Sequence, residues 1–368
     1  MNKLHKMGLI LAGLAVGLGW PEAASAAAPT DNGAAMQWLS LPDSRLEIRG
    51  LPWLEENAPE LWRLPKSARA TVPKAVWSRA VAPDGGRIRF ACNSTALGLR
   101  VQAVQPQGKK CVFDAFVNGA YMSSATPTGT QRLDLVLFKA QDHAWKDVTL
   151  YLPHMHEVRV FAVGLDADAE FKPAPAFARK LPMVCYGSSV LQGSGAAHPS
   201  RTYPAEVARR LNLDYVNLGF GGAGKAEPEV VALVNQLDAC CYLFDLGKSY
   251  GAPTPERYCR MLDTIRAAHP EAPIFCVTPI YSTKEENQPA YKQRSEALRS
   301  LMRDAAMARR QAGDKHLFVV EGLELFGPAD KAEFADALHP NDAGNELMAQ
   351  RLAPLIEKAV LGKARRAP

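Results

Sequence analysis

A proline-rich stretch, Phe171-Lys-Pro-Ala-Pro-Ala-Phe177, divides the sequence into two parts with different hydrophobic patterns. Before it, from residue 36 to about 168, short segments alternate apolar and polar residues with a period of two, which is typical of half-buried strands. The pair Asn118-Gly119 between two of these segments favours a tight hairpin. Turn residues separate the segments, and no helical pattern is found between them. They span 87–92, 97–102, 111–117, 133–137, 147–151 and 158–163. We therefore predict a small β-sandwich over residues 36–170.

After the proline-rich stretch, continuous apolar runs alternate with helical segments. The apolar runs span 181–185, 215–218, 240–246, 274–280 and 317–320. Helices are expected after Thr202, after Thr254-Pro255, over 288–311 and over 342–360. In the second of them, Leu262, Ile265 and Ala268 are expected on the apolar face. Apolar strands separated by helices indicate a parallel sheet covered on both faces, so we predict an α/β domain over 178–362.

The first 26 residues have the pattern of an export signal. Lys3 and Lys6 precede an apolar run, and Ala24-Ser25-Ala26 forms a small-residue cleavage site. The apolar run is too short for a stable membrane span. We therefore expect a mature protein that begins near Ala27, is periplasmic or secreted, and has no membrane contact after the signal is removed.

Charge and cysteine usage argue against two classes of partner. The chain of 368 residues has a formal charge of +5, and its basic tail, Lys363, Arg365 and Arg366, is interpreted as solvated, so no nucleic acid is expected. Seven cysteines occur without a CxxC pair or a Cys/His cluster at ligand spacing, so no metal is predicted. The odd count predicts at least one free thiol. Whether Cys92 and Cys111 form a disulfide stays open.

Hydroxyl, imidazole and carboxylate side chains occur where they could support nucleophilic catalysis. Gly187-Ser188-Ser189 follows an apolar run, and Ser189 is the candidate nucleophile. Asp336 precedes His339 by three residues, so the carboxylate could hold the imidazole in the tautomer that a base requires. The alternatives are a serine at a helix N-cap and a surface histidine at a capped helix start.

Two further stretches lie at the ends of predicted strands. Asn217 to Gly224 contains four glycines, which allow backbone N–H groups to approach a ligand closely. It does not spell GxGxxG with a following acidic residue, so no dinucleotide cofactor is indicated. Asp245-Leu-Gly-Lys-Ser249 follows the apolar run at 240–246, and Lys248 in it is interpreted as a surface charge.

Taken in order, these stretches resemble the motif blocks of the SGNH (GDSL-type) hydrolase superfamily. Tyr186-Gly-Ser-Ser189 is similar to the nucleophile block, Asn217 to Gly222 to the glycine block, and Asp336-x-x-His339 to the block of acid and base. The resemblance implies a flavodoxin-like parallel sheet flanked by helices. Three N-terminal stretches resemble the jelly-roll-like β-sandwich that precedes some SGNH esterases: Gly50-Leu-Pro-Trp53, Arg63-Leu-Pro65 and Phe113-Asp-Ala-Phe116.

The resemblance also implies an activity and roles for residues. It implies an esterase acting on short acyl esters, foremost acetyl esters on carbohydrate, through Ser189, His339 and Asp336, without a cofactor or a metal. The N–H groups of Ser189 and Gly222 would bind the oxyanion. The third block departs from the family pattern, because Ser249 occupies the position where the family has an oxyanion asparagine.

Two rival interpretations remain. An α/β-hydrolase should show G-x-S-x-G, but Leu191 occupies the second glycine position. The departure at Ser249 also leaves open a catalytically weak carbohydrate-binding protein on the same scaffold.

Overall fold

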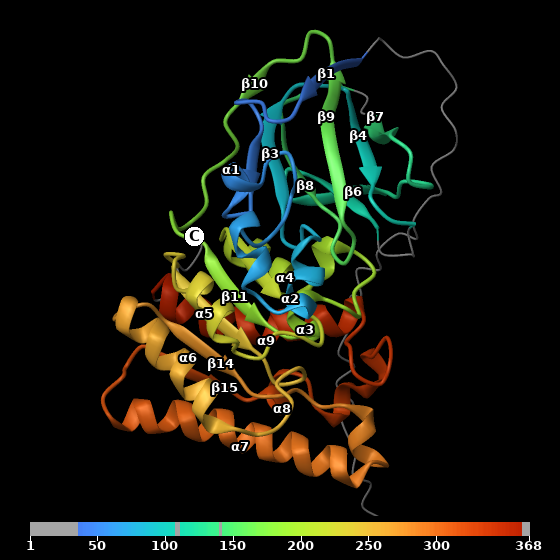
Figure 1. Cartoon of the computed structure of the whole chain (residues 1–368). Coiled ribbons are helices and arrows are strands. Elements are labelled where there is room, and N and C mark those ends of the chain that lie inside the picture. Colours follow the sequence, from blue (N-terminus) through green and yellow to red (C-terminus); the bar gives the residue numbers. More distant parts are fainter. Residues whose placement is uncertain (1–35, 107–110, 140–141, 363–368) are drawn as a thin grey trace, which may run out of the picture. The chain divides into compact units, whose positions relative to one another are not determined.

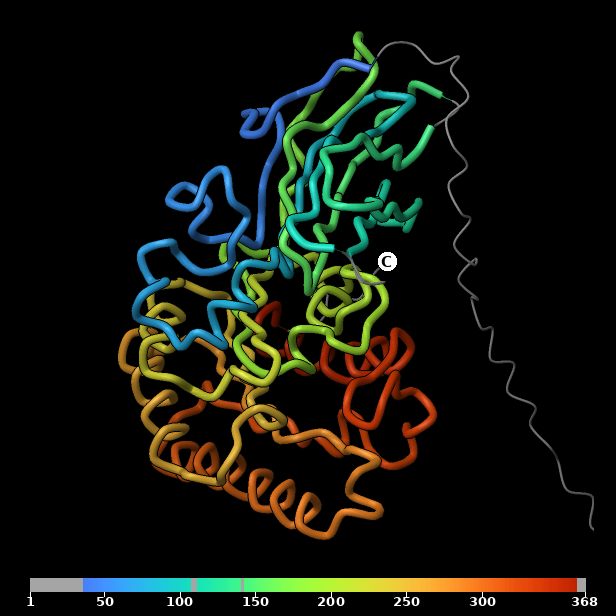
Figure 2. Tube along the Cα trace, turned by 45° about the vertical axis from the view of Figure 1, so that its right-hand side comes forward, coloured from blue at the N-terminus to red at the C-terminus, as the bar shows by residue number. Residues whose placement is uncertain are grey.

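The computed structural model describes residues 36–106, 111–139 and 142–362. All of these residues lie within one compact unit, Asn32–Pro368. The expected export signal (1–26) and the basic tail at Lys363, Arg365 and Arg366 fall outside the described residues. Figure 2 follows the chain from the blue and green part before residue 170 to the yellow, orange and red part after 182.

Two antiparallel sheets form the N-terminal part, which confirms the predicted β-rich region. The strand order of the first sheet is β1 (Met36–Ser40), β9 (Val158–Asp166), β4 (Ala96–Ala103) and β7 (Leu133–Lys139). The second has the order β10 (Phe171–Lys172), β3 (Arg87–Cys92), β8 (Lys146–Tyr151), β5 (Phe113–Val117) and β6 (Ala120–Ala125), with β2 (Glu47–Arg49) beside β3. Phe90, Leu99, Phe113 and Val163 belong to a shared apolar core. All six predicted strands are therefore present.

The hairpin predicted at Asn118-Gly119 joins β5 to β6. Both residues have positive φ angles, 51° and 78°, as a turn that matches the twist of the strands requires. The seven cysteines are all free thiols in the described residues, so Cys92 and Cys111 are not joined. Burial raises the pKa of the Cys111 thiol to about 12.

Three short helices that were not predicted lie between β2 and β3, before the first of the six predicted strands. They are α1 (Leu54–Asn57), the 3-10 helix η1 (Lys66–Ala70) and α2 (Lys74–Ala80). Val76 and Ala80 of α2 are buried in the same core as Val184 and Tyr186 of the following domain. The apolar side chains of α2 therefore pack on a sheet that is distant in sequence.

The C-terminal part contains a parallel sheet of five strands. Its order is β12 (Tyr215–Gly219), β11 (Met183–Gly187), β13 (Cys241–Asp245), β14 (Ile274–Val277) and β15 (Leu317–Val320). This 2-1-3-4-5 order is the flavodoxin-like order that we expected. Gly187 is in register with both Gly219 and Asp245. The ends of three strands therefore meet at one edge of the sheet.

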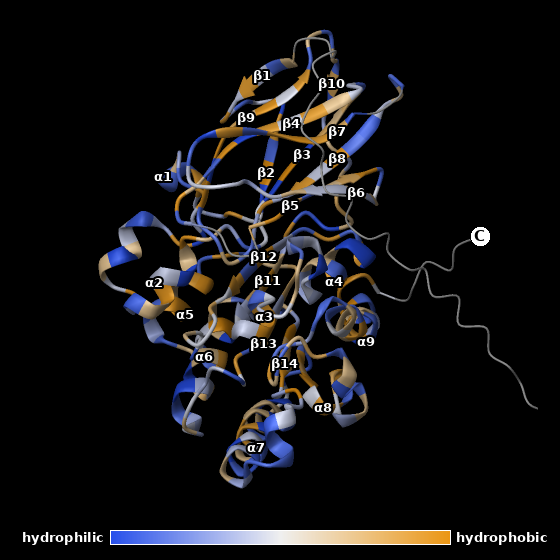
Figure 3. Ribbon diagram, turned by 90° about the vertical axis from the view of Figure 1, so that its right-hand side faces the viewer, coloured by the Kyte–Doolittle hydropathy of each residue, from blue (hydrophilic) through white to orange (hydrophobic). Residues whose placement is uncertain are grey.

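Helices cover both faces of the parallel sheet (Figures 1 and 3). Val184 and Tyr186 belong to the core beneath α5 (Pro228–Val234), α6 (Pro255–Ala268) and α7 (Pro289–Gln311). Met183 and Cys185 belong to the core on the opposite face, beneath α4 (Tyr203–Leu211), α8 (Gly322–Leu325) and α9 (Asp342–Val360). Short helices connect them: α3 (Ser189–Gln192) and the 3-10 helices η2 (Pro199–Arg201), η3 (Thr283–Glu286) and η4 (Pro328–Glu333).

One predicted core position is wrong. Leu262 and Ile265 of α6 are buried, as expected, but Ala268 is exposed. The buried face of this helix starts earlier, at Tyr258 and Met261, and it has turned away from the sheet by the last residue.

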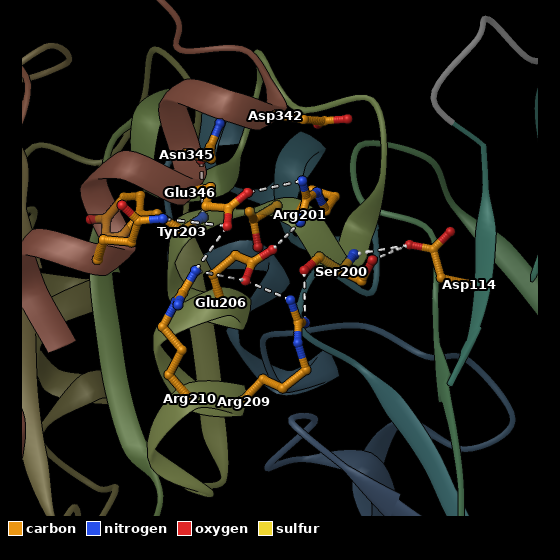
Figure 4. A network of polar contacts seen from close by, with 12 residues as sticks. Asp114, Ser200, Arg201, Tyr203, Glu206, Arg209, Arg210, Asp342, Asn345 and Glu346 are labelled. Carbon is orange, nitrogen blue, oxygen red and sulfur yellow. Dashed lines mark hydrogen bonds and ion pairs between the residues drawn. The ribbon is translucent and has the colours of Figure 1, made fainter. Parts of the chain in front are cut away.

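A polar network connects the sandwich to the helices beside β11 (Figure 4). The fully buried Asp114 of β5 accepts hydrogen bonds from the hydroxyl group and the backbone N–H of Ser200, at 2.6 and 3.1 Å, and pairs with His198 at 2.9 Å. Arg201 bridges Glu206 of α4 and Glu346 of α9. The chain just before α4 is thus fixed from both sides.

Candidate active site

The candidate nucleophile lies directly after β11. Ser188 is fully buried and serves as the N-cap of α3, where its hydroxyl oxygen accepts the N–H of Val190 at 3.3 Å. Ser189 instead lines an open pocket of about 450 Å³, within the range of small-molecule sites. A side chain at Gly187 is excluded, because its Cβ would lie 2.0 Å from the carbonyl oxygen of Asp245. The structure therefore gives the N-cap role to Ser188 and leaves Ser189 facing the pocket.

The helix that follows the serine is short. α3 has a single turn and ends at Gly193, which adopts a left-handed conformation with a φ of 86°. Its N–H groups belong to a first helical turn, which has no acceptors within the helix. The N–H groups of this single turn are therefore the donors available beside Ser189, and no long helix adds its dipole there.

Acid, base and hydroxyl form one continuous chain. Ser189 Oγ lies 2.8 Å from His339 Nε2, and His339 Nδ1 lies 2.8 Å from Asp336 Oδ2. The second carboxylate oxygen of Asp336 accepts the backbone N–H groups of Leu338 and His339 at 2.7 and 2.9 Å. The side chain of Asp336 is 56% exposed and that of His339 19%, so the carboxylate lies on the solvent side of the imidazole.

The surroundings of Asp336 keep it ionised. Burial alone would raise its pKa, but the hydrogen bonds from the His339 side chain and from two backbone N–H groups outweigh burial and lower it. An ionised carboxylate on Nδ1 leaves Nε2 of a neutral imidazole as the acceptor toward Ser189.

The glycine stretch wraps around the end of β11. A Cβ at Gly224 would lie 1.9 Å from the carbonyl oxygen of Gly187, so only glycine fits there. Asn217 does not face the pocket: its amide donates to the carbonyl of Leu191 at 3.1 Å and its oxygen accepts the N–H of Gly219 at 2.9 Å. It therefore joins β12 to α3.

Gly222 and Ser249 meet at the pocket. Gly222 has a φ of 72°, and its N–H donates to the hydroxyl oxygen of Ser249 at 3.1 Å. Both line the pocket together with Ser189 and His339. The structure thus brings all five predicted site residues to one place: Ser189, Gly222, Ser249, Asp336 and His339.

The interpretation of Lys248 as a surface charge is wrong. Its side chain lines the pocket, and Nζ donates to the carbonyl of Tyr281 at 2.9 Å. Burial lowers the pKa of this lysine to about 7, although Glu285 partly opposes the shift. The sequence did contain a signal that Lys248 belongs to the site, because Lys248 directly precedes Ser249 at the end of a predicted strand.

The sandwich part supplies residues that the sequence reading did not assign to the site. Arg63 is fully buried and donates to the carbonyls of Asn217 and Gly219 at 2.8 and 2.7 Å. It also pairs with the buried Asp84 at 3.2 Å. Gln192 extends the set, donating to Asp84 at 3.4 Å and accepting the N–H of Gly221 at 2.7 Å. The glycine stretch is therefore fixed by side chains from before residue 90.

The described residues contain neither a metal-holding cluster of side chains nor a membrane-spanning helix. Among the described side chains, no group of three or more His, Cys, Asp and Glu is arranged to hold a metal ion. None of the described helices is both long enough and apolar enough to cross a bilayer.

Two family models match the chain. Residues 36–171 match the N-terminus of SGNH hydro-type esterases (GxDLY), and residues 180–357 match the GDSL-like Lipase/Acylhydrolase family. Fold and family together define a carboxylic ester hydrolase. The chain belongs to the GDSL-like lipase/acylhydrolase family and carries the N-terminal region of SGNH-type esterases.

Solved structures agree with this fold. A protein described as a GDSL-like lipase from Bacteroides ovatus has a TM-score of 0.78 at 23% identity, over 89% of this chain and 98% of that one. A salicylyl-acyltransferase from a tetracycline biosynthetic pathway has a TM-score of 0.77 at 25% identity, over 89% and 100%. A family two carbohydrate esterase from Clostridium thermocellum, in complex with cellohexaose, has a TM-score of 0.59 at 16% identity, over 75% and 95%. A search of the curated proteins found no match.

Proposed function

We propose that this protein is an exported serine esterase that removes short acyl groups, foremost acetyl, from carbohydrate. One observation carries the proposal: the unbroken chain from Ser189 Oγ through His339 to Asp336, with Ser189 open to a pocket. The proposal of export rests on the charged and apolar pattern of residues 1–26.

The mechanism follows from the hydrogen-bond chain. His339 Nε2 takes the proton of Ser189 Oγ as the oxygen attacks the ester carbonyl, and Asp336 stabilises the imidazolium that forms. The tetrahedral oxyanion is bound by the N–H group of Ser189 and the hydroxyl group of Ser249, and by the N–H group of Gly222 once it exchanges its acceptor, Ser249 Oγ, for the oxyanion. His339 then donates its proton to the departing alcohol. Water, deprotonated by His339, hydrolyses the acyl-enzyme and releases the acid.

The choice of a glycan ester draws on the structural neighbours. They include a carbohydrate esterase in complex with cellohexaose and an acetyl xylan esterase from Butyrivibrio proteoclasticus. The open pocket, with polar and charged residues along its rim, suits a hydrophilic alcohol better than a long acyl chain.

Hydrolysis of acetylated sugars tests the proposal. The purified protein should release acetate from an acetylated glycoside, and Ser189→Ala should lose several orders of magnitude in kcat. Ser78→Ala removes an exposed hydroxyl group on α2 and serves as the control. Binding of the glycoside without release of acetate by the wild-type protein would instead favour a carbohydrate-binding protein.

A further inference from the structure

Four basic side chains line the pocket that contains Ser189. They come from four separate places in the fold, namely α2, the loop after β13, η3 and α7: Arg79, Lys248, Lys284 and Arg294. No acidic residue lies among the described residues that line this pocket. The site therefore offers a concentration of positive charge beside the candidate nucleophile.

Three of these cations surround one aromatic ring. Lys248 Nζ and Lys284 Nζ lie 6.0 and 5.9 Å from the centre of the Tyr291 ring, and Arg294 Cζ lies 5.0 Å from it. The ring attracts each cation, but three like charges gathered around one side chain also repel one another. A negative charge bound between them would relieve that repulsion.

The acidic groups nearest to this cluster already have partners. Glu285 pairs with Arg299 at 2.7 Å, and Glu286 accepts the hydroxyl group of Tyr281 at 2.6 Å and pairs with Lys331. Asp336 is occupied by His339. Within the part of the chain that the structure describes, no carboxylate forms an ion pair with Arg79, Lys248, Lys284 or Arg294. Glu285 and Asp245 favour the charged form of Lys248 through space, but none of the described carboxylates is paired directly with the cluster.

Lys248 is half-buried and contacts the loop that follows β14. Its Nζ uses one donor on the carbonyl of Tyr281, which leaves two N–H groups for a ligand. Lys284 is also half-buried, whereas Arg294 is exposed and has a planar guanidinium that can bind a carboxylate with two hydrogen bonds. The cluster thus combines two half-buried amines with an exposed guanidinium at the rim.

We propose that this pocket selects esters that carry a carboxylate near the bond to be cleaved, bound by Lys248, Lys284 and Arg294. The inference rests on the proposed esterase function and defines its substrate class. The carboxylate has two possible sources: a uronic acid, on the alcohol half of the ester, or a dicarboxylic acyl group, on the acyl half. Both present the same chemistry to the cluster.

Two matched pairs of esters measure the preference and distinguish the sources. The first pair is an acetylated methyl glucuronoside and its uronamide, in which only the carboxylate of the alcohol half is neutralised. The second pair is the succinate half-ester of a methyl glucoside and the corresponding succinamate ester. We expect kcat/KM to be at least about tenfold higher for the anionic member of one pair, since charge-assisted hydrogen bonds exceed neutral ones in strength.

Variants identify the responsible cations. Arg294→Gln should reduce the ratio of anionic to neutral kcat/KM several-fold, and Arg294→Glu should bring it below one. Lys292→Gln removes a positive charge from the same helix, but Lys292 does not line the pocket and lies 3.9 Å from Glu296. This control should keep the wild-type ratio. Circular dichroism checks that each variant is folded.

The outcomes separate this inference from the esterase function. Equal kcat/KM within both pairs would overturn the inference while leaving the esterase intact. Failure to hydrolyse any ester would overturn the esterase function, and calorimetric titration of Ser189→Ala protein with the four esters of the two pairs would still report anion preference. Tighter binding of the anionic member of either pair, lost in Arg294→Glu, supports the inference; equal binding within both pairs overturns it.

Discussion

The backbone N–H of Gly222 donates a hydrogen bond to the hydroxyl oxygen of Ser249 at 3.1 Å. Because the oxygen of Ser249 is the acceptor, its own proton remains available toward the pocket. Gly222 and Ser249 are also the two groups proposed to bind the oxyanion together with the Ser189 N–H. The pair joins the glycine stretch to the loop after β13 at the point where negative charge would develop.

Substitution of Ser249 should act on turnover rather than on binding, because the oxyanion exists only in the tetrahedral state. Ser249→Ala removes both the acceptor of the Gly222 N–H and a donor, so kcat should fall. An asparagine reaches further and can donate and accept at once, so Ser249→Asn should raise kcat by up to about tenfold, equal to about 1.4 kcal/mol. Hydrolysis of one acetyl ester is followed for both variants, with KM expected to change little. If neither variant changes kcat, Ser249 does not contact the oxyanion.

Ser189, His339 and Asp336 should act as a unit, so substituting any one of them should remove most of the activity. His339→Ala should be nearly as inactive as Ser189→Ala, and Asp336→Asn somewhat less so, because the imidazole loses its orientation but not its position. The double variant Ser189→Ala/His339→Ala should be little worse than either single variant. Steady-state kinetics on the same ester measures all four, and multiplicative losses in the double variant would place His339 outside the proposed chain.

Arg63 should be essential for stability although it does not contact the pocket. Arg63→Leu leaves Asp84 buried without its cation and several carbonyl groups without a donor, a loss of about 3–5 kcal/mol. The double variant Arg63→Leu/Asp84→Leu removes the stranded charge and should recover part of this loss. Urea unfolding measures the free energies. If the double variant loses more free energy of unfolding than the two single variants lose together, the Arg63–Asp84 pair is not the source of the effect.

The pair between His198 and Asp114 should make stability depend on pH. The hydrogen bond that His198 donates to Asp114 raises the pKa of His198, with burial opposing the shift and Asp342 adding to it. The stabilisation is therefore complete below the unfolded pKa of about 6.5 and is lost as the pH rises through the folded pKa. His198→Gln should lower the free energy of unfolding by about 1–3 kcal/mol at pH 6 and by less at pH 9. If His198→Gln lowers the free energy of unfolding at pH 9 as much as at pH 6, or more, this prediction is wrong.

Much of the architecture could be predicted from local patterns. The apolar runs defined all five parallel strands, and the ends of β11, β12 and β13 had to meet because parallel strands share one edge. This geometry is why three of the four stretches, far apart in sequence, converge on one pocket. Weakly buried strands such as β1 and β6 escaped detection, since most of their residues are at least partly exposed.

The remaining features depend on contacts that no local pattern reveals. Arg63 lies 154 residues before Asn217, whose carbonyl it binds, and nothing in its own neighbourhood shows that it is buried. Lys248 was predicted on the surface because a lysine at a strand end is usually solvated. Its burial depends on the loop that carries Tyr281 and on α7, which close over it from elsewhere in the chain.

The central claim is that Ser189 becomes covalently acylated, and a fluorophosphonate that mimics the tetrahedral state tests it most directly. Peptide mass spectrometry after labelling should find one adduct, on the serine at position 189. Ser189→Ala should abolish it, whereas Ser188→Ala, which removes only the cap of α3, should keep it. An adduct on Ser188 or elsewhere, or no adduct in a folded wild-type protein, would contradict the account.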